Sequence, residues 1–200
     1  PYHLKHHKFT ETDQDPDLSL SAPFPITKAS FMRKIIRDLS GLTGIRRYSS
    51  SFKSIFSTEA RNLSHKLSKV NDKLGGFILT NLIIFCLISY FFHWYIFLLL
   101  WWLPSLTYYS LIIRIRNIAE HALVPKENNL NNTRTTLASP LIKYLMVPLN
   151  VNFHLEHHLF TSCPWYNLPK AHENLKQNGF LDNMCIEPSY RSVIKRVTAG

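Results

Sequence analysis

Residues 77–113 read FILTNLIIFCLISYFFHWYIFLLLWWLPSLTYYSLII, and this stretch decides the fold of the chain. It contains no Lys, Arg, Asp or Glu. As one straight helix it would be roughly 55 Å long at about 1.5 Å per residue. The hydrocarbon core of a bilayer is only ~30 Å thick, and tilt cannot absorb such a difference. The stretch therefore predicts two helices that each cross a membrane.

The most suitable place to divide the stretch is near His93, where aromatic side chains cluster. Trp and Tyr are enriched where a helix leaves the hydrocarbon and meets water. A tight turn there gives an all-α membrane protein with a transmembrane helical hairpin, its spans at about 77–93 and 95–113. Pro104 is expected to kink the second span, which membrane helices tolerate. The clustered aromatic residues are Tyr90, Phe91, Phe92, Trp94 and Tyr95.

The chain carries a formal net charge of +10, and its basic residues gather at the two ends of the apolar stretch. Lys and Arg in this position mark the cytoplasmic side of a membrane and contact anionic lipid head groups. We prefer this interpretation to nucleic-acid binding, and it places both ends of the hairpin in the cytoplasm. The residues concerned are Arg46, Arg47, Lys53, Arg61, Lys66, Lys69, Lys73, Arg114 and Arg116.

The flanking segments predict short helices and turns. A basic helix is expected over residues 30–39, ending near Gly41, and another over 170–177, ending at Gly179. Residues 45–75 suit either a helix on the membrane surface or a flexible basic linker. Residues 137–151 are apolar but interrupted, and we expect an interfacial or packed segment there. The cysteines, 3 in number, form no C-x-x-C pair, so neither a disulfide framework nor a structural zinc site is expected.

Two copies of the pattern H-x-x-H-H lie outside the hairpin, one before it and one after it in the sequence. They are His3-Leu4-Lys5-His6-His7 and His154-Leu155-Glu156-His157-His158. Positions i, i+3 and i+4 share one face of a helix, so each copy is expected to aim three imidazoles at one point. Imidazole is a common ligand for transition metals. Six such nitrogens exceed the three or four that one zinc ion takes from a protein, which favours a site with two metal ions.

Directly after the hairpin, Asn117 and His121 lie four residues apart and therefore share a helical face. His121 is a candidate seventh nitrogen ligand, and Asn117 is a candidate ligand through a water molecule. Both H-x-x-H-H patterns have to lie on one side of the membrane to share a site, which requires an even number of spans between them. The remaining histidines, His65, His93 and His172, stand alone and are expected to be surface or interface residues.

Metal-binding histidines usually hold their second ring nitrogen against a carboxylate or carbonyl group. The acidic residues near the patterns are candidates for this supporting role, although each of them also suits a solvated surface or a helix cap. These candidates are Glu120, Glu156, Asp13, Asp15 and Asp17.

These motifs resemble those of the integral-membrane fatty acid desaturases and related hydroxylases. Residues 2–7 look like the second histidine box of that family, and residues 152–158 look like the third. Asn117-x-x-x-His121 looks like its additional ligand helix. The segments 15–18, 37–39 and 132–136 are also similar to bacterial members, so that the resemblance covers essentially the whole chain. The family's first box, H-x-x-x-(x)-H, is not found in this sequence, and we expect it upstream of Pro1 with a first pair of spans.

The resemblance implies a partial desaturase domain over residues 1–200. Its cytosolic segments, 1–76 and 114–200, would form a helical cap that carries the histidine boxes, and 77–113 would form the hairpin, lining a tunnel for the substrate. The implied enzyme uses two non-heme iron ions and O₂ to place a double bond in a fatty acyl chain. Electrons would come from an external donor of ferredoxin, rubredoxin or cytochrome b5 type. On this interpretation the chain is a C-terminal fragment that is inactive by itself.

Three alternatives remain open at this point. A carotenoid, sterol or sphingolipid hydroxylase of the same superfamily would use the same boxes. A membrane zinc hydrolase would need a Glu base beside a few His ligands. A basic membrane anchor without catalytic activity would bind metal only incidentally. The acyl chain length, the double-bond position and the ester form of the substrate are not encoded in any of these motifs.

Overall fold

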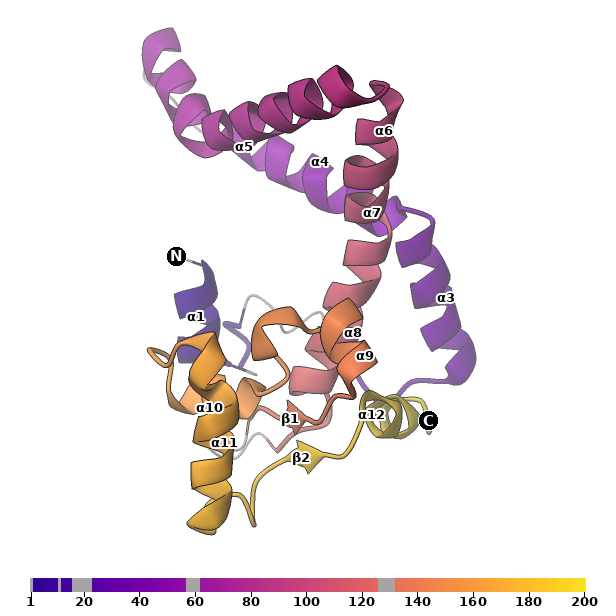
Figure 1. Cartoon of the computed structure of the whole chain (residues 1–200), viewed down its shortest axis with the longest axis vertical. Coiled ribbons are helices and arrows are strands. Elements are labelled where there is room, and N and C mark those ends of the chain that lie inside the picture. Colours follow the sequence, from indigo (N-terminus) through magenta and orange to yellow (C-terminus); the bar gives the residue numbers. More distant parts are fainter. Residues whose placement is uncertain (1, 11, 16–22, 57–61, 126–131) are drawn as a thin grey trace. The chain divides into compact units, whose positions relative to one another are not determined.

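The structure is a computed structural model of the chain, and it describes residues 2–10, 12–15, 23–56, 62–125 and 132–200 (Figure 1). The chain forms two compact units. One comprises Arg33–Leu111, and the other comprises Pro1–Met32 together with Ile112–Gly200. Within the described residues most of the chain is helical and the only strands are two short ones, which confirms the all-α prediction.

The unit Arg33–Leu111 contains the hairpin. Its helices are α4 (Leu42–Phe56), α5 (Leu63–Phe91), α6 (Tyr95–Phe97), the π-helical turn η1 (Leu98–Trp102) and α7 (Leu103–Leu106). Two further helices, α3 (Lys28–Leu39) and α8 (Tyr108–His121), each contribute residues to both units. The helix predicted over residues 30–39 is confirmed as α3. It ends before Gly41, whose φ of 83° suits a residue without a Cβ.

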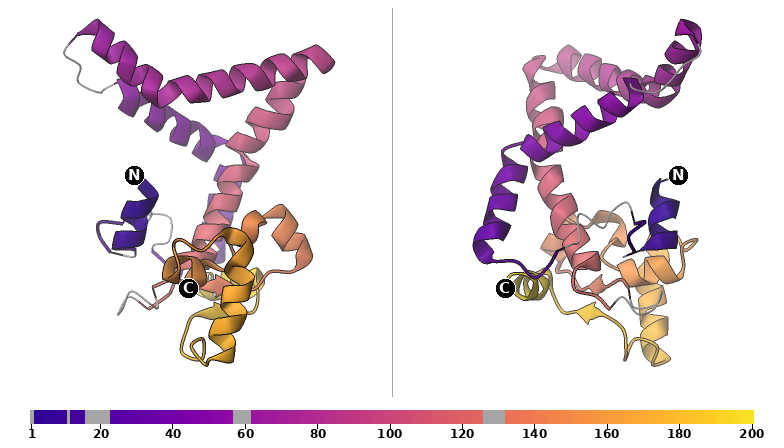
Figure 2. Two further views of the ribbon diagram at one scale, coloured as in Figure 1. Left: turned by 60° about the vertical axis from the view of Figure 1, so that its left-hand side comes forward. Right: turned by 180° about the vertical axis from the view of Figure 1, so that it is seen from behind.

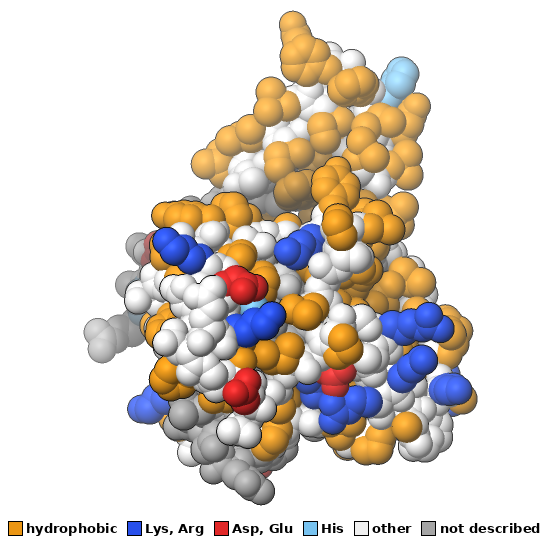
Figure 3. All heavy atoms as spheres, turned by 60° about the horizontal axis from the view of Figure 1, so that its bottom comes forward, with side chains coloured by type: hydrophobic (Ala, Val, Ile, Leu, Met, Phe, Trp, Pro, Cys, Tyr) orange, Lys and Arg blue, Asp and Glu red, His pale blue; other side chains and the backbone are white. Residues whose placement is uncertain are grey.

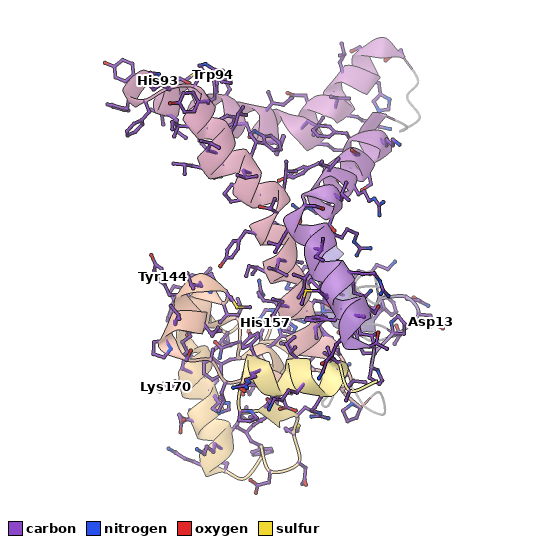
Figure 4. The ribbon with its side chains drawn as sticks, turned by 90° about the vertical axis from the view of Figure 1, so that its right-hand side faces the viewer. Asp13, His93, Trp94, Tyr144, His157 and Lys170 are labelled. Carbon is purple, nitrogen blue, oxygen red and sulfur yellow. The ribbon has the colours of Figure 1, made fainter. Side chains whose placement is uncertain are left out.

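The hairpin turns where the aromatic cluster predicted, because α5 ends at Phe91 and α6 begins at Tyr95. Figure 4 shows His93 and Trp94 at this turn. The first helix starts well before residue 77. α4 and the early part of α5 make residues 45–56 and 63–75 helical, so a flexible linker is wrong for those residues. The second helix is interrupted by η1 immediately before Pro104, as expected near a proline, and again at Thr107 (φ −104°, ψ −82°).

Both arms of the hairpin are long and apolar enough to cross a membrane. Leu67–Phe91 spans 25 residues with a mean hydropathy of 2.1, and Tyr95–His121 spans 27 residues with a mean hydropathy of 1.7. Within the most apolar 18-residue window of each segment only 6% and 11% of the residues are buried inside the protein, so neither window is part of the core helix of a soluble domain. In the upper part of Figure 3 the side chains drawn are almost all hydrophobic. Lipid is the solvent that suits such a surface.

Helix α4 packs closely on the second arm of the hairpin. Tyr48 of α4 lies 5.3 Å from Trp102 between ring centroids, and Arg47 donates a hydrogen bond to the Ser105 carbonyl at 2.9 Å. The approach is closest at Gly44, where an added Cβ would lie 2.4 Å from the backbone oxygen of Leu106. Only a glycine therefore allows α4 to meet the second arm at this distance.

We expect Gly44→Ala to destabilise the hairpin unit by about 1–3 kcal/mol, because the new methyl group meets backbone rather than a movable side chain. Gly76→Ala in α5 is the matched control, since its Cβ would enter open space. Alanine is the better helix former by roughly 0.5–1 kcal/mol, so this control should be neutral or stabilising. The thermal unfolding midpoint of the detergent-solubilised protein, followed by tryptophan fluorescence, distinguishes the two. Equal midpoints for both variants would contradict the close packing at Gly44.

The other unit is assembled from short elements. In chain order these are α1 (Tyr2–Phe9), the later part of α8, β1 (Thr135–Thr136), α9 (Pro140–Leu145), η2 (Pro148–Asn150), α10 (His154–Leu159), η3 (Trp165–Asn167), α11 (Leu168–Gln177), β2 (Ile186–Glu187) and α12 (Tyr190–Val197). α11 is followed by Gly179 with a φ of 71°, as predicted. Residues 137–151 form short turns of helix and no span.

The core of this unit fixes the end of α8. Ile118 and Ala122 are fully buried, and Leu155 of α10 is buried with them. The Arg134 guanidinium donates hydrogen bonds to the carbonyls of Ala122 at 2.7 Å and Ala119 at 3.4 Å. These carbonyls have no partner within the helix, because they belong to its last turn. Arg134 therefore caps α8 at the point where His121 emerges.

Candidate metal centre

The residues of both H-x-x-H-H patterns meet in this unit, together with His121. The pattern His3–His7 lies on α1 and the pattern His154–His158 lies on α10. The two helices lie side by side in both views of Figure 2. The seven imidazoles form two groups, and within each group the donor nitrogens lie within 4.8 Å of one another. The four-histidine group is mostly buried, whereas the three-histidine group is more open to solvent. The first consists of His6, His121, His154 and His158, and the second of His3, His7 and His157.

The distances within the groups suit ions that are shared by several nitrogens. In the three-histidine group, the Nε2 atoms of His3, His7 and His157 lie 3.0, 3.1 and 3.3 Å apart. In the four-histidine group, His154 Nε2 lies 2.9 Å from that of His121 and 3.1 Å from that of His158.

Hydrogen bonding alone does not account for such a triangle of nitrogens. Each Nε2 offers either one proton or one lone pair, so three mutual contacts cannot all be hydrogen bonds. Two imidazole nitrogens that each lie ~2.1 Å from a common ion at ordinary coordination angles are ~3.0–3.4 Å apart. The donor atoms therefore fit two metal ions.

Each box divides its histidines between the two groups. His3 and His7, the outer pair of the box on α1, join His157, the middle histidine of the box on α10. The middle residue His6 in turn joins His154 and His158. The expectation that each box aims three imidazoles at one point is therefore wrong. At ~100° per residue, i+4 lies ~40° to one side of i and i+3 lies ~60° to the other, so the middle side chain diverges from its neighbours.

Two of the candidate carboxylates lie behind these imidazoles. His6 Nδ1 lies 2.9 Å from Asp15 Oδ1, and both side chains are buried. Glu120 Oε2 lies 3.9 Å from His154 Nδ1, and the other oxygen of Glu120 accepts a hydrogen bond from Arg116 Nε at 3.2 Å. Each contact leaves Nε2 directed into the four-histidine group. A carboxylate at hydrogen-bond distance, as Asp15 is from His6, is suited to orient a ligating imidazole and to fix its tautomer, whereas Glu120 at 3.9 Å adds only a nearby negative charge.

The other candidates are placed differently. Glu156 contacts His172 at 2.6 Å, so it does not support a box histidine directly. His172 is correspondingly buried, and its assignment to the surface or an interface was wrong, although it belongs to neither histidine group. Asp13 is exposed and lies away from His157 in Figure 4, and Asp17 lies outside the described residues. Asn117 is buried, and its Oδ1 has no hydrogen-bond partner within the described part of the chain.

The surroundings favour the neutral form of His7 on α1 and of His154 and His158 on α10. Burial, together with the neighbouring imidazoles of His157 and His3, lowers the pKa of His7 to about 4. Burial is also the main reason that the pKa of His154 and that of His158 lie well below their usual range, and nearby histidines add to it. Neutral imidazole is the form that binds a metal ion, so His7, His154 and His158 need not lose a proton at pH 7 to do so.

A pocket of about 320 Å³ opens beside both groups. Its walls include His3, His154 and His157, and most of its remaining lining is apolar. No sequence motif marks the apolar residues, which come from η2, the loop after it, η3 and α11. A pocket of this kind accepts a hydrocarbon chain and brings it close to the histidines. The apolar lining residues are Leu149, Val151, Trp165 and Leu168.

The sequence model of the fatty acid desaturase family matches residues 1–183, which is nearly the whole chain. No curated protein and no solved structure gives a significant match. The matched range contains the hairpin, all seven clustered histidines and the pocket beside them. The chain therefore belongs to the fatty acid desaturase family, whose members are di-iron oxidoreductases of the desaturase and hydroxylase kind.

Proposed function

We propose that this protein introduces a double bond into a fatty acyl chain, using O₂ and two iron ions. The single observation that carries the proposal is the convergence of seven imidazoles into two adjacent groups. His6, His121, His154 and His158 would hold one iron, and His3, His7 and His157 the other, with Asn117 as a further ligand through water. Imidazole ligation also suits zinc, and family membership is what favours iron.

The chemistry that bound iron supplies is the oxidation of an unactivated C–H bond, which acid–base side chains cannot achieve. In the overall reaction an acyl chain loses two hydrogens from adjacent carbons, and O₂ takes these and two further electrons and protons to give two waters. The electrons would come from a ferredoxin, a rubredoxin or a cytochrome b5. Zinc has no redox role, so a zinc-loaded protein would not perform this reaction.

The residues of the chain supply position and exclusion of water. Asp15 would hold the ring of His6 from behind, and Glu120 would place a negative charge near the ring of His154. The pocket lined by Leu149 and Trp165 would hold the acyl chain against the three-histidine group. Apolar walls favour a hydrocarbon over water by roughly 0.8 kcal/mol for each buried CH₂ group. Several methylenes in the pocket therefore suffice to fix the chain beside the metal ions.

The membrane setting is consistent with such a substrate. The apolar hairpin anchors the protein where acyl lipids reside, and the basic residues at its two ends favour a cytoplasmic active site in a multi-pass protein.

Expression of the full coding sequence in a host that lacks the activity tests the proposal. The host is fed defined saturated fatty acids, and its lipids are analysed by mass spectrometry with the His154→Ala protein as control. A new double bond that depends on His154 supports the proposal. A hydroxylated product with unchanged unsaturation would instead identify a lipid hydroxylase. A purified protein that contains zinc alone and acts without O₂ would identify a hydrolase. An unchanged lipid profile would favour a basic membrane anchor without catalytic activity.

Asp15→Asn is expected to weaken iron binding about tenfold, because the amide holds the His6 ring less firmly than the carboxylate does. Asp13→Asn is the matched control, since Asp13 is exposed two residues away. Iron retained by each purified variant against a graded series of chelator concentrations measures the difference. Equal retention by both variants would show that the buried contact between Asp15 and His6 does not support the metal centre.

A further inference from the structure

A buried polar network lies on the opposite side of α10 from the metal groups. Glu156 is completely buried, and its Oε1 lies 2.6 Å from Nδ1 of His172 on α11. Its other oxygen, Oε2, accepts a hydrogen bond from the hydroxyl of Thr135 on β1. Thr135 is itself fully buried. A buried carboxylate is costly unless its oxygens are satisfied, and here both oxygens have partners from elements distant in sequence.

The position of Glu156 within α10 gives this network its significance. Glu156 lies two residues after His154 and two before His158, so its side chain is ~200° around the helix from theirs. The histidines of α10 point toward the metal groups, and Glu156 points back toward α11 and β1. A contact on the rear of a helix fixes the rotation of that helix about its own axis.

The rotation of α10 about its own axis determines where its three histidines lie. One face supplies His154 and His158 to the four-histidine group, while His157, ~100° away from His158, belongs to the three-histidine group. A small rotation of this short helix would move all three donors at once. α10 spans only residues His154–Leu159, so its own hydrogen bonds hold it weakly, and tertiary contacts have to fix its position.

We propose that Glu156, His172 and Thr135 form a positioning network that sets the rotation of α10 and thereby the geometry of both metal groups. The proposal rests on the proposed metal-binding function. His172 contributes through Nδ1, which has to carry the proton in order to donate to the carboxylate at this distance. The ring centroid of His172 also lies 5.1 Å from that of Phe153, the residue before α10. This ring contact is a second interaction that fixes the start of the helix.

The test compares two variants of similar size at one position. In His172→Asn, the side-chain amide takes the place of Nδ1 and can still donate to Glu156. In His172→Gln, the amide takes the place of Nε2 and misses it. We expect His172→Asn to bind iron as the wild type does and His172→Gln to bind about tenfold more weakly, the lower end of the range for residues that support metal ligands. Glu156→Gln should resemble His172→Gln, and Glu173→Gln, an exposed neighbour on α11, is the matched control.

The readouts are the chelator concentration that removes half of the iron, the Mössbauer spectrum of the bound iron, and circular dichroism of the metal-free protein. A weakened and spectrally altered centre in a folded His172→Gln protein, restored in His172→Asn, supports the proposal. Wild-type affinity and spectrum in His172→Gln would overturn it, and so would failure of both variants to fold, since the pair would then be a general stability element. A wild-type protein that binds no iron would instead refute the proposed function.

Discussion

Replacing His154 with alanine is expected to remove one of two bound irons and to reduce lipid oxidation to background. The division of the boxes between the groups makes this expectation more specific. His6→Ala should remove the same iron as His154→Ala, although His6 belongs to the other box. His7→Ala and His157→Ala should each remove the second iron. The physical reason is that each pair shares one group of nitrogens, and an ion that loses one of three or four donors is held far more weakly.

Iron content per chain and Mössbauer spectra of the single variants and of the double variant His6→Ala/His154→Ala measure this. The double variant should retain the second iron with an unchanged spectrum. His93→Ala is the control, because His93 lies at the turn of the hairpin and belongs to neither group. If His3, His6 and His7 variants all removed one and the same iron, each box would hold its own ion, and the crossed arrangement would be refuted.

The double variant Leu82→Asp/Ile83→Asp is expected to prevent stable insertion of the hairpin. Both side chains lie in the apolar middle of α5 and are exposed in the protein, where lipid is expected to surround them. An aspartate at the centre of a membrane helix costs roughly 3 kcal/mol, so the pair costs about 6 kcal/mol. That penalty is large enough to shift most of the protein out of the membrane fraction.

Extraction of membranes with alkaline carbonate, followed by protease protection of tags on the two ends of the hairpin, measures the effect. Leu67→Asp is the control, since Leu67 lies at the start of α5 among polar and basic residues. It should remain inserted with both tags on one side. Persistence of the double variant in the membrane fraction would show that α5 does not span the bilayer.

The hairpin was predictable because its signal is local. A membrane span is determined by the hydropathy of consecutive residues, and the turn at residues 92–94 follows from aromatics that prefer the interface. The helix ends at Gly41 and Gly179 were predictable for a similar reason, since a left-handed backbone favours glycine. The start of α5 was not predicted, because a helix can continue past the membrane without any change in its hydrogen bonding.

The sequence also identified all seven clustered histidines, because spacing alone places them on helical faces. It could not assign them to groups. The position of a metal group depends on how α1, α8 and α10 approach one another, and that approach is decided by packing between residues distant in sequence. Asp15 was among the candidate carboxylates, but no pattern distinguished it from Asp13 or assigned it to His6.

The sequence by itself determined that this is a helical membrane protein with two histidine boxes and a seventh histidine. Hydropathy and helical periodicity act over a few residues, and those properties are written directly in the chain. Only the tertiary structure decided that the middle histidine of each box joins the outer histidines of the other box. It also decided that Glu156 contacts His172 rather than a box histidine, and that a pocket opens beside the metal groups. These features depend on contacts across the chain, where the rotation of one short helix decides which nitrogens meet.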